Sequence, residues 1–181
     1  MIPLIAQTSR LLILASSRAL LTAELHKPQY FPVLLGAAMP ASWPPAEYDQ
    51  AAMEFLLEKL TAGGRNAAGW YGWYALRKAD DNIPRTLIGS GSFMGPPDAN
   101  GMAEISYFIA PEWRGQGLAT ELVAGLVQQA AATGMVRQLV AHTAVEDGAS
   151  QRVLLHNGFV SAGTDVNGRL RFERLVEPAK A

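Results

Sequence analysis

The segment 103–133 constrains the fold of this chain more than any other stretch. Its beginning, up to Ile109, is rich in β-branched and aromatic side chains that roughly alternate, as is typical of a strand. Pro111 stops this strand because proline cannot donate to a sheet ladder. After the sequence RGQG at 114–117, apolar residues recur at helical spacing from Leu118 onward. The segment therefore predicts a strand, a sharp glycine turn and a helix.

The predicted start of this helix is a candidate anion-binding site. The first four N–H groups of a helix have no intrahelical partner, and the helix dipole adds partial positive charge there. Gly115 and Gly117 lack Cβ atoms, so the backbone can come close to a ligand, as a pyrophosphate cradle requires. The alternative is a helix that only needed a tight entry turn, and the glycine spacing alone leaves both readings open.

The identity of the pattern favours the first reading. The sequence RGQGLA at 114–119 fits R/Q-x-x-G-x-G/A and, with the strand before it, resembles the acetyl-coenzyme A (acetyl-CoA) site of the GNAT superfamily of N-acetyltransferases. The Rossmann fingerprint fits less well, because its third glycine would fall at Thr120. A Walker A motif is absent from the sequence, because no Gly-Lys-Ser/Thr follows the glycines.

A second segment, 147–159, resembles the N-x-x-S-x-x-V-L-x-x-x-G-F stretch of the GNAT branch that contains the ribosomal-protein N-terminal alanine and serine acetyltransferases. The matching positions are Ser150, Val153, Leu154, Gly158 and Phe159. The segment departs from the pattern at Asp147, where the family usually has the asparagine that contacts the pantetheine arm.

The resemblance implies a fold and a cosubstrate. The expected fold is α/β (α+β), a single GNAT-like domain over residues 1–181 with Arg10 to Val176 as its folded core. Its mixed central sheet would have about seven strands splayed in the middle, flanked by about four helices, with acetyl-CoA in the gap. The residues expected to contact acetyl-CoA are Phe108, Ile109, Arg114, Gly115, Gln116, Gly117, Leu118, Ala119, Thr120, Asp147 and Ser150.

These contacts have different expected roles. The backbone amides of 115–120 would hold the pyrophosphate, and Arg114 would add positive charge. The main-chain groups of Phe108 and Ile109 would pair with pantetheine and the thioester oxygen.

The implied reaction, direct transfer of an acetyl group to an amine, needs a base. Alkylammonium groups have a pKa of about 10, and chain termini about 8, so the amine must lose a proton before it attacks. Glu104 is the first candidate, because alternation along the strand places it on the same face as Ser106 and Phe108. The alternative is an exposed or ion-paired strand glutamate, and Asp165 and Glu173 are reserve bases.

Ser150 is the candidate acid or hydrogen-bond donor to the departing thiolate, since Leu154 occupies the position where the family more often has tyrosine. The alternative role for Ser150 is that of a helix-terminal serine that makes a local backbone bond.

The predicted acceptor is a primary amine, either a protein N-terminus or a small molecule, because this fold serves many acceptors. The alternative function is a non-catalytic acyl-CoA sensor or partner-binding module, suggested by Asp147 and by the missing tyrosine.

Composition limits the other function classes. Fifteen basic and sixteen acidic residues give a net charge of -1, which disfavours nucleic acid as a ligand. The chain has no cysteine, and His26, His142 and His156 are too far apart to suggest a metal site. The apolar run 11–14 is too short to span a membrane, so we expect a cytoplasmic protein.

The remaining predictions concern the order of elements. The segment 29–45 carries so many prolines that we expect no regular element there; it would serve as an acceptor-binding lip, a cover for the core or a homodimer contact. The other expected elements are strands at 10–14, 70–76, 86–93, 103–109, 137–143, 159–162 and 170–176, with helices at 18–26, 48–60, 118–133 and 149–156.

Overall fold

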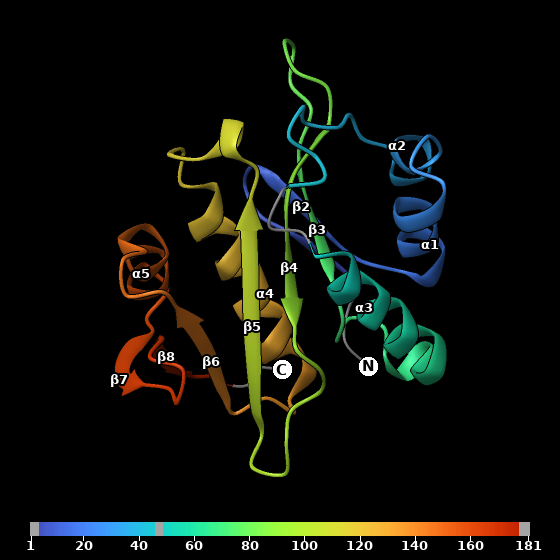
Figure 1. The fold of residues 1–181 in the computed structure, drawn as a ribbon. Helices are drawn as coiled ribbons and strands as arrows, with labels where there is room; N and C mark the ends of the chain where they lie inside the picture. The colour runs from blue at the N-terminus through green and yellow to red at the C-terminus, as the bar shows by residue number, and fades with distance from the viewer. Residues whose placement is uncertain (1–3, 46–48, 178–181) are drawn as a thin grey trace.

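Eight strands form a mixed sheet in the order β1-β2-β3-β4-β5-β6-β8-β7 in the computed structural model, which describes residues 4–45 and 49–177 (Figure 1). The strands are β1 (Ile5–Gln7), β2 (Leu11–Ala15), β3 (Trp73–Arg77), β4 (Thr86–Phe93), β5 (Met102–Ile109), β6 (Gln138–Thr143), β7 (Val160–Thr164) and β8 (Leu170–Leu175).

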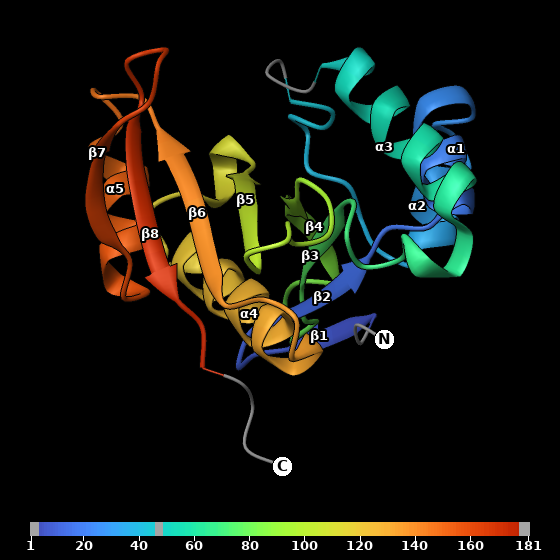
Figure 2. The same cartoon turned by 90° about the horizontal axis from the view of Figure 1, so that it is seen from below.

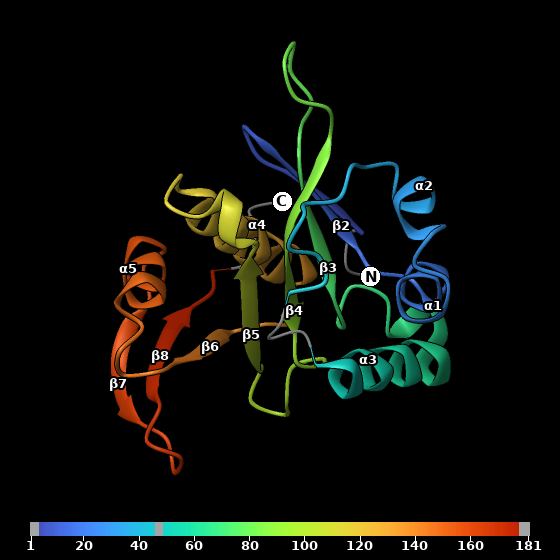
Figure 3. The same cartoon turned by 45° about the horizontal axis from the view of Figure 1, so that its top comes forward.

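Helices cover both faces of this sheet. They are α1 (Arg18–His26), α2 (Phe31–Leu35), α3 (Gln50–Gly63), α4 (Leu118–Thr133) and α5 (Gly148–His156). Figure 2 shows α1, α2 and α3 on one face and α4 on the other, and α5 packs against α4. Two buried clusters result, one between the sheet and α4 and one beneath α1 to α3. Figure 3 shows that α1 to α3 and α5 lie toward opposite ends of the sheet.

The sheet opens between β5 and β6. These strands are parallel and pair only over Met102–Glu104 with Gln138–Val140 in the described residues. Beyond that point they diverge, as Figure 1 shows, while β5 stays paired with β4 as far as Ile109. The predicted fold class, a mixed sheet splayed in the middle, is confirmed, with eight strands and five α-helices instead of about seven and about four.

Among the strands and α-helices, two short elements were not predicted. β1 pairs with β2, so the sheet begins before Arg10. The expectation that 29–45 holds no regular element was wrong, because α2 lies within it. Pro32 sits in the first turn of α2, where a missing N–H breaks no helical hydrogen bond. Tyr48, the predicted start of the second long helix, lies outside the described residues; α3 begins at Gln50.

The segment 29–45 covers the core. Phe31 and Leu35 are buried in the cluster beneath α1 to α3. Trp43 packs against the same cluster, and its indole N–H donates to Glu24 at 2.9 Å. Of the three roles considered for this segment, the contacts within the chain support that of a core cover.

Candidate active site

A cavity of about 730 Å³ lies where β5 and β6 diverge, beside the N-terminal ends of α4 and α5. Its volume is within the roughly 300–1,000 Å³ of cavities that hold sizeable ligands. All of the predicted acetyl-CoA contacts except Gln116 line it. The full lining is Tyr107, Phe108, Ile109, Arg114, Gly115, Gly117, Leu118, Ala119, Thr120, Asp147, Ala149, Ser150, Arg152, Val153 and His156.

The start of α4 offers free main-chain donors to this cavity. Gly117 is the N-cap at φ 74°, and no side chain in the described parts of the chain caps the helix there. The helices α1, α3 and α5 are capped by Ser17, Asp49 and Asp147. A Cβ built on Gly115 would meet no described atom within 4 Å. The first turn of α4 is thus open to an anion, and this part of the site fits a pyrophosphate.

Hydrogen bonds from Arg10, which lies between β1 and β2, hold this turn. The Glu121 carboxylate, in the first turn of α4, accepts hydrogen bonds from the Arg10 backbone N–H and from Arg10 Nε, both at 2.7 Å. Arg10 Nη1 also donates to the carbonyl of Gln116 at 2.9 Å. Gln116 therefore helps to hold the turn in place, and it is not among the lining residues of the cavity. Burial opposes ionisation of Glu121, but the hydrogen bonds from Thr8 and Arg10 and the charge of Arg10 lower its pKa to about 2.

The start of α5 is capped from within. Asp147 Oδ1 accepts the Ser150 backbone N–H at 3.0 Å, and Oδ2 accepts the Ser150 hydroxyl at 2.6 Å. Burial opposes ionisation of Asp147, but hydrogen bonds from Ser150 and Ala149 and the charge of Arg114 lower its pKa. Ser150 therefore makes the local bonds of a helix-terminal serine, although it also lines the cavity.

The end of β5 presents its main chain to the gap at alternate residues. The Glu104 carbonyl accepts from Met94 N, and Ala110 N donates to the Ile88 carbonyl, so the even-numbered residues of β5 face β4. Tyr107 and Ile109 consequently direct their main-chain groups toward the gap. Arg114 Nε donates to the Ile109 carbonyl at 2.8 Å.

This geometry corrects the role expected for Phe108. Its main-chain groups pair with Ser90 of β4, which leaves them unavailable to pantetheine. Its ring lines the cavity instead, with the Arg114 guanidinium 5.3 Å from the ring centroid.

A second cavity, of about 250 Å³, lies on the opposite face of β5, beneath α3. It shares Tyr107 and Phe108 with the first cavity, so the two meet at the end of β5. Its lining comprises Ser16, Leu21, Asp49, Ala52, Met53, Phe55, Leu56, Gly72, Trp73, Tyr74, Ser90, Gly91, Ser92, Met94, Ser106, Tyr107 and Phe108.

Comparison with known families agrees with this geometry. A family model described as an acetyltransferase (GNAT) domain matches residues 20–160. The chain belongs to the GNAT acetyltransferases. It is accordingly an acetyl-CoA-dependent acetyltransferase.

Individual relatives share only part of their sequence with this chain. The uncharacterized N-acetyltransferase YjdG of Bacillus subtilis (strain 168) is 26% identical over 126 residues, which cover 70% of this GNAT chain and 71% of that protein. The ribosomal-protein-serine acetyltransferase of Escherichia coli (strain K12) is 34% identical over 77 residues, which cover 42% of this chain and 43% of that protein.

Solved structures share the fold. RimL, a ribosomal L7/L12 alpha-N-protein acetyltransferase in complex with coenzyme A, has a TM-score of 0.67 at 19% identity and covers 97% of this chain and 99% of its own. The ribosomal-protein-S5-alanine acetyltransferase from Vibrio fischeri has a TM-score of 0.67 at 13% identity, with coverage of 99% and 100%.

Tyr107 is a site residue of this GNAT chain that the sequence analysis missed. Tyr107 is a lining residue of both cavities, its side chain packs against the cluster between the sheet and α4, and its hydroxyl donates to the Ser150 carbonyl at 3.1 Å. Burial raises the pKa of Tyr107 to about 12, and the nearby charge of Asp147 acts in the same direction. The hydroxyl therefore stays protonated at neutral pH. The signal in the sequence is a tyrosine near the end of the central strand, whereas the family's usual tyrosine position is occupied by Leu154.

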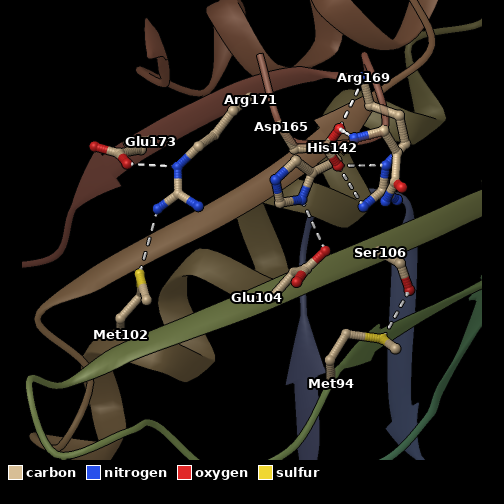
Figure 4. A network of polar contacts seen from close by, with 10 residues as sticks. Met94, Met102, Glu104, Ser106, His142, Asp165, Arg169, Arg171 and Glu173 are labelled. Atoms are coloured by element: carbon tan, nitrogen blue, oxygen red, sulfur yellow. Dashed lines mark hydrogen bonds and ion pairs between the residues drawn. The ribbon is translucent and has the colours of Figure 1, made fainter. Parts of the chain in front are cut away.

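Glu104 lines a third hollow, of about 220 Å³. Its carboxylate bonds His142 Nδ1 at 2.9 Å, from the last residue of β5 that pairs with β6 to the part of β6 beyond its partner, Val140 (Figure 4). Met94 lines both this hollow and the 250 Å³ cavity, so the two are neighbours. The Glu104 side chain is 41% exposed, which leaves it open to water and to ligand.

The reserve bases are held elsewhere. Asp165 accepts hydrogen bonds from Arg169 Nε at 2.8 Å and from the Asn167 backbone N–H at 2.9 Å, in the turn between β7 and β8. Glu173 accepts from Arg171 Nε and Gln138 Nε2, both at 2.7 Å (Figure 4 shows Arg171 and Glu173). Neither acid belongs to the described lining of the three cavities.

Within residues 4–45 and 49–177, no group of three or more histidine, aspartate or glutamate side chains is arranged to hold a metal ion. Among the helices that the structure describes, none is both long and apolar enough to cross a membrane.

Proposed function

We propose that this GNAT enzyme transfers an acetyl group from acetyl-CoA to a primary amine, the acceptor being a peptide N-terminus or a small molecule. The observation that carries the proposal is the meeting of two cavities at Tyr107 and Phe108. One of them opens onto the uncapped start of α4, and the other reaches β5 from the opposite face. Such an arrangement brings two substrates together at the end of one strand.

The cosubstrate side is proposed to work mainly through the backbone. The N–H groups of 115–120 would hold the pyrophosphate, and Arg114 beside them would add charge. Acetyl-CoA supplies the reactive acetyl thioester. The main-chain groups of Tyr107 and the N–H of Ile109 would bind the pantetheine arm, a role supported by their direction toward the gap, while the Ile109 carbonyl accepts from Arg114 Nε.

The proton-transfer roles fall to three side chains. Glu104 is proposed as the base that takes the proton of the amine, directly or through a water molecule. Tyr107 and Ser150 are both candidates to hydrogen-bond the leaving sulfur. Both hydroxyls already donate within the protein, but Ser150 donates to the charged carboxylate of Asp147 at 2.6 Å, whereas Tyr107 donates to the neutral carbonyl of Ser150 at 3.1 Å and can leave its acceptor at lower cost. We therefore assign the donor role first to Tyr107.

A second candidate function is an acyl-CoA sensor that binds the thioester without transfer. The occupied hydroxyl of Ser150 is the observation that favours it. It would use the same 730 Å³ cavity and leave the 250 Å³ cavity without a catalytic purpose.

One assay separates the two functions. Acetyl-CoA is incubated with the protein and a panel of amines and peptides, and free thiol release is followed while calorimetry measures acetyl-CoA binding. We expect amine-dependent release of thiol. Binding without release on any acceptor would contradict the transferase and support the sensor.

A further inference from the structure

The cavity beneath α3 has mainly apolar walls. Ala52, Phe55 and Leu56 of α3 face Trp73 of β3 across it. Phe55 packs edge-on against Tyr71, with ring centroids 6.4 Å apart, so this wall is built from packed aromatic groups. A ligand that enters the cavity would exchange water mainly for carbon, which favours an apolar body.

The hydroxyl groups in the cavity are largely committed to the protein. Ser16 Oγ donates to the Tyr71 carbonyl at 2.6 Å, and Ser92 Oγ donates to the Phe93 carbonyl at 2.7 Å. Ser106 Oγ lies 3.9 Å from the sulfur of Met94, a weak acceptor (Figure 4). The walls would thus leave several polar groups of a sugar or polyamine without partners, which costs binding free energy.

The charge of the cavity is equally specific. Asp49, at the N-cap of α3, is the single charged residue in the described lining. One carboxylate suits one ammonium group, whereas a polycation would need several and an acidic ligand would need a basic partner. At about 250 Å³ the cavity is also smaller than those that hold drug-sized ligands, roughly 300–1,000 Å³.

We infer that the acceptor is a singly charged primary amine with a compact apolar or aromatic body, such as an arylalkyl amine or a peptide whose first side chain is apolar. This inference rests on the proposed function. The base first takes one proton from the ammonium group, and the neutral nitrogen then bonds the acetyl carbon. The carbon–sulfur bond breaks, and the second proton of the nitrogen passes to the thiolate, which leaves a neutral amide and a free thiol.

Matched acceptors test the inference. The thiol-release assay compares 2-phenylethylamine with spermidine, and peptides that differ only in a first residue of Leu, Phe, Asp or Lys. We expect kcat/KM roughly 10- to 100-fold higher for the apolar member of each set, from the burial of one apolar group. A higher value for the small amines would identify a metabolite-sized acceptor, and a higher value for the peptides would identify a chain N-terminus.

A substitution that fills the cavity tests the same inference from the side of the protein. Ala52 and Ala51 are consecutive, exposed alanines of α3, and only Ala52 belongs to the described lining. Ala52→Trp should raise KM for the apolar amine at least tenfold and leave acetyl-CoA affinity unchanged. Ala51→Trp, the control, should change neither. Equal effects of the two variants, or higher kcat/KM for spermidine or for the Lys or Asp peptides, would overturn the inference.

Direct binding separates this inference from the proposed function. Calorimetry measures 2-phenylethylamine binding to the wild type and to Ala52→Trp in the presence of coenzyme A. Binding that Ala52→Trp abolishes, without transfer to any amine, would support the apolar site and contradict the transferase. Transfer that prefers polycations would support the transferase and contradict the apolar acceptor.

Discussion

The two faces of β5 use different parts of the polypeptide to build a binding site. On the α4 face, backbone N–H groups next to Gly115 and Gly117 line the 730 Å³ cavity. On the α3 face, the 250 Å³ cavity is enclosed by side chains such as Leu56 and Trp73. A backbone cradle suits a ligand that never changes, whereas a side-chain pocket changes with each substitution. The acceptor should therefore be the variable partner and acetyl-CoA the constant one.

The largest expected loss of activity comes from substituting Glu104, in the 220 Å³ hollow beside the 250 Å³ cavity. Glu104→Gln removes the proposed base but keeps an oxygen that accepts from His142 Nδ1. We expect kcat to fall roughly 100-fold or more, because a positioned base typically contributes 10²–10⁴-fold. Acetyl-CoA affinity, measured by calorimetry, should be unchanged, since Glu104 lies outside the described lining of the 730 Å³ cavity.

Glu173→Gln is the matched control, because Glu173 is also a hydrogen-bonded strand glutamate, paired with Arg171, but it lies on β8, two strands from β5, and outside the described lining of the three cavities. It should leave kcat within about twofold, well below the contribution of a positioned base. If Glu104→Gln has no greater effect than Glu173→Gln, Glu104 is not the base.

The second effect tests the backbone cradle. Gly117→Val places a β-branched side chain at φ 74°, where the left-handed backbone costs on the order of 1–2 kcal/mol for a residue with a Cβ. Because the start of α4 must shift to relieve this strain, we expect acetyl-CoA to bind roughly 10- to 100-fold more weakly by calorimetry. Binding of 2-phenylethylamine on the other face of β5 should persist.

Gly134→Val controls for strain alone. Gly134 is the C-cap of the same helix at φ 65°, and a Cβ there meets no described atom within 4 Å. This variant should lower the melting temperature comparably without weakening acetyl-CoA binding. Equal losses of affinity in the two variants would mean that the start of α4 does not hold the cosubstrate.

The two faces also differ in how far the sequence reveals them. The cradle is contiguous: a strand, two glycines and a helix within 103–133 are recognisable before any folding. The 250 Å³ cavity is assembled from α3, β3, β4 and β5, and its Ala, Leu and Ser residues resemble ordinary core positions in the sequence. Its location therefore required the tertiary structure.

The missed elements have a similar cause. β1 and α2 span three and five residues, too few for a hydrophobic period to become visible. Arg10 and Glu121 are 111 positions apart, so their support of the glycine turn could not be inferred from either sequence neighbourhood. Tyr107 belongs to the lining of both cavities, and that position became visible only once the cavities on the two faces of β5 were located.

A third prediction concerns the point where the faces meet. Tyr107→Phe keeps the ring and removes the hydroxyl that donates to the Ser150 carbonyl. We expect kcat to fall roughly tenfold, the effect of losing one hydrogen bond of about 1.4 kcal/mol to the leaving sulfur, with acetyl-CoA affinity within about twofold. Ser150→Ala should instead weaken the cap of α5, which unfolding by urea would detect. The reverse pattern, with the larger loss of kcat in Ser150→Ala, would reassign the donor role to Ser150.

The smallest effect tests what holds the cradle in place. At pH 7 Glu121 is ionised and accepts from Thr8 and Arg10, so Glu121→Gln should lower the free energy of unfolding by about 1–2 kcal/mol, since Arg10 is half exposed and partly screened. The folded pKa of about 2 lies below the ordinary 4.5, so this stabilisation is complete above pH 4.5 and declines as pH falls toward 2.

Urea unfolding of wild type and Glu121→Gln at pH 7 and pH 3.5 measures this difference, which should be smaller at pH 3.5. Glu58→Gln, on the exposed side of α3, is the control and should show little difference at either pH. Because Arg10 links Glu121 to the Gln116 carbonyl, Glu121→Gln should also weaken acetyl-CoA binding severalfold while 2-phenylethylamine binding stays constant. A variant that loses stability but keeps full acetyl-CoA affinity would show that the Arg10–Glu121 pair stabilises the fold without positioning the start of α4 for acetyl-CoA.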